Sequence, residues 1–168
     1  MNDNENSKIE KNIEKIYSDK AKNLLKICIG ILIFSGITYL IGISLYNSFD
    51  FGLIFEIISF IFIIIAYNKI EQNDFKSGKT NIIIAIIPIG WLIIYDFINL
   101  LANINEVLLE VIYYYTSFDQ YFYYLEPYLF DVTLVATIIL LYKSYSSLNK
   151  TDCSKQSDNY IDTFYDKL

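Results

Sequence analysis

The stretch that decides the fold is NIIIAIIPIGWLIIYDFINLL, residues 81–101. Among its side chains only Asp96 is an aspartate, glutamate, lysine or arginine, and nearly all the others are apolar. A helix of this length rises about 30 Å at ~1.5 Å per residue, which matches the hydrocarbon core of a bilayer. We therefore predict a transmembrane helix over residues 81–101.

Three more segments have the same character, over residues 24–46, 51–67 and 128–145. Of the 168 residues, 54% are hydrophobic, which is too apolar for an ordinary soluble domain. Residues 47–50 leave room for only a tight turn between the first two segments. The sequence thus predicts an all-α integral membrane protein, a four-transmembrane-helix bundle over residues 24–145.

The lysines predict the orientation of this bundle. All 13 basic residues are Lys, and they fall before or at the start of 24–46, between the second and third spans, or at and after the end of the fourth. Residues 47–50 and 102–127 contain none. Because positively charged short loops stay cytoplasmic, we expect both termini in the cytoplasm. An Ile- and Lys-rich chain without Arg is typical of AT-rich bacterial genomes, so we expect the bacterial cytoplasmic membrane.

Two polar segments flank the membrane domain. In residues 1–23, Ile9, Ile13, Ile16 and Tyr17 recur at helical spacing. This segment is either an interfacial helix on the inner leaflet or a solvated helix. Residues 146–168 are expected to form a polar, loosely ordered cytoplasmic tail.

The connection between the third and fourth spans is rich in tyrosine, a residue that favours the headgroup region. It begins with an apolar stripe at helical spacing, so we predict an amphipathic outer helix with an aromatic belt. A sharper alternative is an outer contact surface for an extracellular ligand or partner. That surface would be formed by Tyr113, Tyr114, Tyr121 and Tyr124.

Three acids lie inside the predicted spans, and each is costly to insert. Glu56, Asp96 and Asp131 all fall near the outer end of their helices. No lysine shares this layer, so each carboxyl must be protonated, hydrated, hydrogen-bonded or bound to a cation. With Ser59 and Asn99, one turn beyond an acid, they form a candidate polar or cation site. The alternatives are acids that reach outward to headgroup water, and a proton relay.

Pro88 and Gly90 lie in the middle of the third span, where Pro88 removes a backbone donor. We predict a kink here, which serves either a gate or static packing. The glycines of the first span, six residues apart, do not match the spacing of close glycine-mediated helix pairs.

Ser77-Gly78-Lys79-Thr80 is similar to the end of a phosphate-binding loop, but Asn73 stands where the first glycine is required. A membrane helix also precedes it in place of a strand. We therefore expect no nucleotide binding, and interpret the segment as a cytoplasmic turn with Thr80 or Asn81 capping the third span.

The absence of His and Arg removes the usual proton shuttle, metal ligand and phosphate clamp. We therefore expect no catalytic residues, metal, cofactor or nucleic-acid partner. The leading hypothesis is a non-enzymatic protein that acts through contacts in the membrane with another protein or itself, as a regulator, assembly factor or immunity-type protein. The alternative is a cation- or proton-linked small transporter or channel. A lipid-directed intramembrane enzyme is the third and weakest hypothesis.

Overall fold

The computed structural model describes residues 3–46, 52–102 and 131–151, and all of them except the short turn at 72–74 are helical. Three helices are α1 (Asp3–Tyr46), α2 (Gly52–Glu71) and α3 (Phe75–Ala102). The fourth covers residues 131–151. Three of the described segments are long and apolar enough to cross a membrane: Lys11–Ile41, Gly52–Glu71 and Phe75–Asn99. The expected helical, membrane-type bundle is therefore confirmed at this level.

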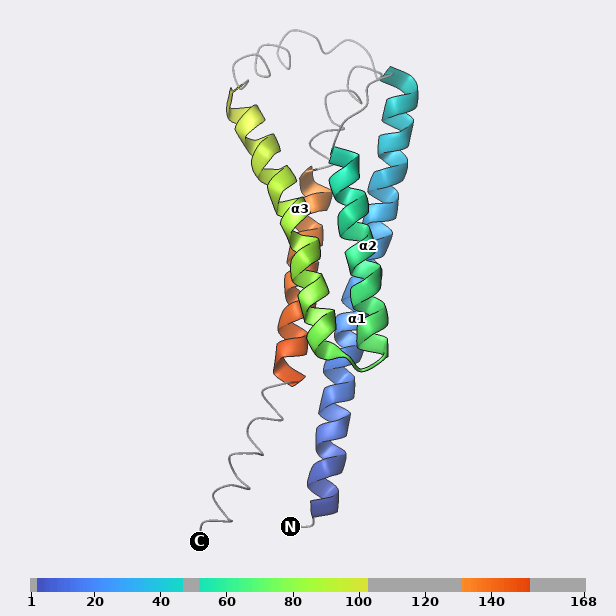
Figure 1. Cartoon of the computed structure of the whole chain (residues 1–168), viewed down its shortest axis with the longest axis vertical. Coiled ribbons are helices and arrows are strands. Elements are labelled where there is room, and N and C mark those ends of the chain that lie inside the picture. Colours follow the sequence, from blue (N-terminus) through green and yellow to red (C-terminus); the bar gives the residue numbers. More distant parts are fainter. Residues whose placement is uncertain (1–2, 47–51, 103–130, 152–168) are drawn as a thin grey trace.

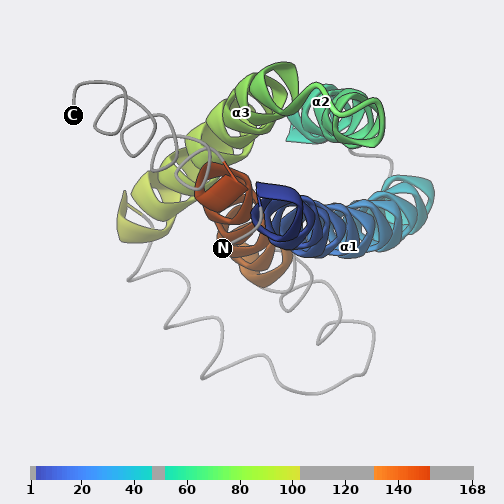
Figure 2. The ribbon, with the colours of Figure 1, turned by 90° about the horizontal axis from the view of Figure 1, so that it is seen from below.

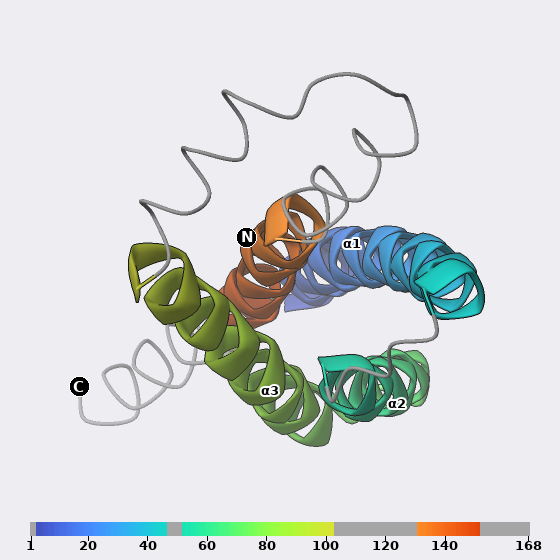
Figure 3. The same cartoon turned by 90° about the horizontal axis from the view of Figure 1, so that it is seen from above.

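The helices alternate in direction around the bundle (Figure 1). Viewed along the bundle, helix 131–151 lies between α1 and α3 on one side, and α2 lies between them on the opposite side (Figures 2 and 3). The beginning of α1, the α2–α3 turn and the end of helix 131–151 lie toward the same end (Figure 1). We call this the lysine end, because the described lysines gather toward it. These are Lys8, Lys11, Lys15, Lys20, Lys22 and Lys26 on α1, Lys69 on α2, Lys76 and Lys79 on α3, and Lys143 and Lys150.

Each helix buries one narrow seam, whose residues recur in steps of three and four. This spacing is the 3.5-residue repeat of left-handed helix packing. On α1 the seam is Ser18, Ala21, Leu25, Cys28, Leu32 and Ser35; on α2 it is Gly52, Glu56, Ser59, Ile63, Ala66 and Ile70. On α3 it is Phe75, Gly78, Ile82, Ala85, Ile89 and Leu92, and in the fourth helix Leu134, Thr137, Leu141, Ser144, Leu148 and Thr151.

Small residues recur every seven positions within these seams. On α1 they are Ala21, Cys28 and Ser35, and the fourth helix has Ser144 seven residues after Thr137. Ser144 Oγ donates to Ala21 O at 3.2 Å, and Cys28 Sγ contacts Thr137 O at 3.9 Å. Moving seven residues forward along α1, from Ala21 to Cys28, moves the contact seven residues back along the fourth helix, from Ser144 to Thr137. The two backbones approach closely in antiparallel register because small side chains face each other.

Large apolar side chains cover the outside of the bundle. Ile33, Phe34, Ile61, Ile87 and Trp91 each expose about half or more of their surface. A soluble protein seldom exposes a continuous apolar surface of this extent. The arrangement of small and polar residues inside and large apolar residues outside fits a bundle solvated by lipid.

The helix α1 is continuous through residue 23, where the sequence suggested a change from a polar segment to a span. Its first turns project beyond the α2–α3 turn (Figure 1). Lys150 lies over the ring of Tyr17 at 5.7 Å, which joins this part of α1 to the fourth helix. Ile9 and Ile16 are exposed on the projecting part.

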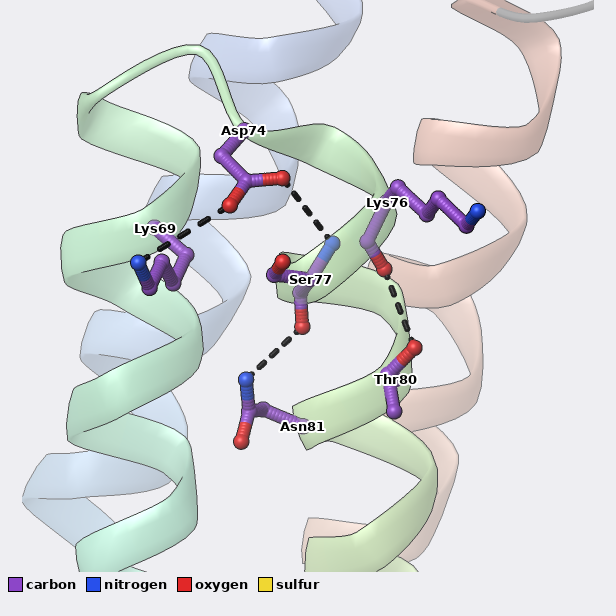
Figure 4. A network of polar contacts seen from close by, with 6 residues as sticks. All are labelled: Lys69, Asp74, Lys76, Ser77, Thr80 and Asn81. Carbon is purple, nitrogen blue, oxygen red and sulfur yellow. Dashed lines mark hydrogen bonds and ion pairs between the residues drawn. The ribbon is translucent and has the colours of Figure 1, made fainter.

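The α2–α3 turn is built from local hydrogen bonds (Figure 4). Asn73 has a φ of 60°, a left-handed conformation that Asn tolerates, and its N–H donates to Ile70 O while Asp74 N donates to Lys69 O. This pair of bonds is the Schellman ending of a helix. Asp74 Oδ1 then accepts from Ser77 N at 3.2 Å, so Asp74 caps α3.

The expectation that Thr80 or Asn81 caps the third span is therefore wrong. Helix α3 begins at Phe75, six residues before the predicted start of the span. Thr80 Oγ1 donates to Lys76 O, and Asn81 Nδ2 donates to Ser77 O, both bonds lying within the helix (Figure 4). The polar first turn of α3 hid its start, because the prediction followed hydropathy.

We predict that Gly78→Ala destabilises the protein by about 1–3 kcal/mol. A Cβ at Gly78 would lie 2.7 Å from Ile70 Cγ1, so the buried Ile70 side chain or one of the two helices would have to shift. The matched control is Gly30→Ala, because a Cβ at Gly30 meets nothing within 4 Å. Thermal unfolding of both variants in the same detergent measures the difference. Equal stability of the two variants would contradict the close α2–α3 contact.

Asp74 should make the stability of this turn depend on pH. Its pKa is lowered from 3.8, first by the hydrogen bond from Ser77 and further by the charge of Lys69, whose Nζ lies 3.8 Å from Asp74 Oδ2. A lowered pKa stabilises the folded state above the unfolded pKa, and this stability is lost as the pH falls through the folded value. Thermal unfolding of wild type and Asp74→Asn should therefore differ at neutral pH and converge below pH 3.8. A difference that stays constant with pH would contradict this assignment.

Candidate polar site at the end opposite the lysines

Glu56 lies in the seam between α2 and α1. Only 3% of its surface is exposed, although it lies just over one turn from the start of α2. Its Oε1 accepts a hydrogen bond from Ser35 Oγ of α1 at 2.9 Å. Ser35 occupies the seam position seven residues after Cys28, so the packing register of α1 brings its hydroxyl to the carboxyl group.

Ser59 lies one turn further along α2, on the same buried face as Glu56. Its side chain is fully buried, and its Oγ has no hydrogen-bond partner among the residues that the structure describes. A buried polar group without a partner is unusual and calls for an explanation.

Asp96 and Asp131 meet across a different pair of helices. Asp96 is on α3, Asp131 is the first described residue of the fourth helix, and their carboxyl groups lie close enough to interact. Both residues are half-buried.

The three acids therefore lie toward the end opposite the lysine end, in two separate contacts. Glu56 is in the first half of α2, Asp96 is near the end of α3, and Asp131 is the first described residue of its helix. In Figure 1 these helix ends lie together, away from the α2–α3 turn. One contact joins α1 to α2, and the other joins α3 to helix 131–151.

The remaining candidate residues are more dispersed. Asn99 is exposed, three residues beyond Asp96. Pro88 lies inside α3, which stays helical through it, and Gly90 is half-buried with open space where a Cβ would be. Tyr113, Tyr114, Tyr121 and Tyr124 lie outside the described residues.

Other buried hydroxyls take part in helix packing, and sequence reasoning missed them. Ser144 donates across to α1, as described above. Thr137 and Ser147 instead donate to carbonyls one turn back in their own helix, at Thr133 and Lys143. Thr137 and Ser144 recur on the seam, and their seven-residue spacing was visible in the sequence. These hydrogen bonds indicate a structural role: they join two helices, or they give a buried hydroxyl a partner within its own helix.

Among the described residues, no group of three or more Cys, Asp or Glu side chains could hold a metal ion. Cys28, the free cysteine of the described part, is buried against the fourth helix. What the arrangement offers chemically is a buried carboxyl with hydroxyl neighbours and a half-buried carboxyl pair. Comparison of the chain with protein-family models, with curated proteins and with solved structures finds no match to any of them.

Proposed function

We propose that the chain crosses the bacterial cytoplasmic membrane four times, with both termini in the cytoplasm. The supporting observations are the alternating direction of the four helices and the position of the described lysines at one end of them. Positive charge on short loops favours the cytoplasmic side. In this arrangement residues 131–151 supply the fourth span, and the pairs of acids lie toward the outer leaflet.

Labelling with a membrane-impermeant maleimide tests this topology. We expect Cys153 to react only after the cells are permeabilised, whereas a cysteine placed by Ser48→Cys, two residues after the end of α1, reacts in intact cells. Cys28 serves as an internal control, since it is buried and should react in neither case. Labelling of Cys153 in intact cells would contradict the proposed orientation.

We further propose that the protein is not an enzyme and acts through protein contacts in the membrane, as a regulator, an assembly factor or an immunity-type protein. The observation that carries this proposal is the use of the interior acids. Glu56 joins α2 to α1 through its hydrogen bond with Ser35, and Asp96 meets Asp131 between α3 and helix 131–151. Interior polar groups that hold helices together leave the outer surfaces for contact with other molecules.

The structure describes one surface that a partner could contact, and the sequence predicts another. The projecting part of α1 exposes Ile9 and Ile16 among charged side chains at the lysine end. The outer Tyr-rich connection is the second, and its role stays a prediction from the sequence. A membrane partner could contact either surface without any change in the packed seams.

Purification from native membranes in a mild detergent tests the proposal. We expect a second protein to co-purify in constant ratio with the wild type. The ratio should fall severalfold with Tyr121→Ala and Tyr124→Ala together, or with Ile9→Ser and Ile16→Ser together. Thermal stability should change little in the second pair, because Ile9 and Ile16 are exposed. Gly30→Ala provides a matched control on an exposed helix position.

The purification should use a strain in which deletion of the gene has a phenotype. If only this chain is recovered from such cells, the result would count against the protein-contact proposal. Reconstitution into liposomes then distinguishes the alternative. A cation- or proton-linked transporter should give an ion flux that Asp96→Asn changes, because that substitution alters the carboxyl pair. A contact protein should give no flux above that of empty liposomes.

A further inference from the structure

The seam between α1 and α2 contains a small cluster of oxygen atoms at Glu56. Glu56, Ser59 and Ser35 are 3%, 0% and 2% exposed. Ser35 Oγ donates to Glu56 Oε1 at 2.9 Å, and this is the side-chain hydrogen bond that Glu56 makes in the described part of the chain. A carboxylate has about four lone-pair sites, so one donor leaves most of its capacity unused.

Ser59 provides the second, independent observation. Its Oγ is buried and without a partner among the described residues. Side chains three residues apart on a helix are neighbours, with about 5–6 Å between Cβ atoms. The hydroxyl is therefore within reach of an atom bound at the Glu56 carboxylate, on the same buried face of α2.

The charge balance favours a cation at this position. The described lysines of α1 and α2 nearest in sequence are Lys26, nine residues before Ser35, and Lys69, thirteen residues after Glu56, and both lie toward the lysine end. Lys26 lies over the ring of Tyr67 at 5.6 Å, and Lys69 lies 3.8 Å from Asp74. Neither lysine is placed to neutralise the carboxylate.

We propose that Glu56, Ser35 and Ser59 bind one dehydrated monovalent cation of the size of Na⁺ between α1 and α2. Carboxylate and hydroxyl oxygens are hard ligands that suit alkali-metal and alkaline-earth ions. A single carboxylate balances one positive charge, whereas a divalent ion takes six or more oxygen ligands and usually more than one carboxylate. This site is independent of the proposed protein contacts, and either could exist without the other.

Carbodiimide labelling of the purified full-length protein tests the site. Dicyclohexylcarbodiimide modifies protonated carboxyl groups in apolar surroundings, and a bound cation protects them. Mass spectrometry should show that NaCl slows modification of Glu56 at least severalfold relative to choline chloride at equal ionic strength. With Ser59→Ala, half-protection should require roughly tenfold more Na⁺, because one ligand to a charged ion is lost.

Two controls separate ion binding from packing. Ser59→Thr keeps a hydroxyl and should retain protection at the wild-type Na⁺ concentration. Ser147→Ala removes a largely buried hydroxyl that donates within its own helix, and it should not change protection. If Ser59→Ala does not fold, the wild type alone decides, since Na⁺ should raise its unfolding temperature more than choline does.

Three results would overturn the proposal. They are equal Glu56 modification in NaCl and choline chloride, protection of Ser59→Ala at the wild-type Na⁺ concentration, and a wild-type unfolding temperature that does not respond to Na⁺. The first result would mean that the Ser59 hydroxyl binds a buried water molecule or has no ligand. Loss of the co-purifying partner would leave all three measurements unchanged, so the two proposals fail separately.

Discussion

Close approach of helices in lipid is the constraint on which this structure depends. The bilayer is as apolar as the side chains, so burying leucine between helices gains little over leaving it in lipid. Helices associate instead where small residues allow backbones to meet. Ala21 opposite Ser144 and Cys28 opposite Thr137 show this directly, because each pair forms a contact between a side chain and a backbone carbonyl.

The same constraint explains why polar groups lie inside the bundle. A seam of alternating small and large residues has room for hydroxyls, and these donate to carbonyls in their own helix or the next one. Glu56 occupies a position that is Ile in the next two repeats of its seam, at Ile63 and Ile70. Its carboxyl group therefore lies in the helix interface, and Ser35 meets it because Ser35 occupies the matching position on α1. The candidate site is a product of the packing register.

The sequence was sufficient for the helical membrane bundle and for placing all three acids toward one end, because hydropathy and lysine position vary on the scale of whole helices. It was not sufficient for the ends of those helices. Asp74 caps α3 through a single hydrogen bond to Ser77, and hydropathy carries no trace of that bond. The spacing of the glycines did not reveal the seam, because the close approach of α1 to its neighbour uses three other small residues, Ala21, Cys28 and Ser35.

The pairing of the acids could not be predicted, since periodicity places a residue on a helix face without naming the helix opposite. Asp96 meets Asp131, while Glu56 meets Ser35 across another interface. The two contacts therefore respond differently to helix movement. Separation of α3 from helix 131–151 would break the carboxyl pair, yet the α1–α2 contact would persist. If all three acids formed one central cluster, movement of any one helix would disturb every acid at once.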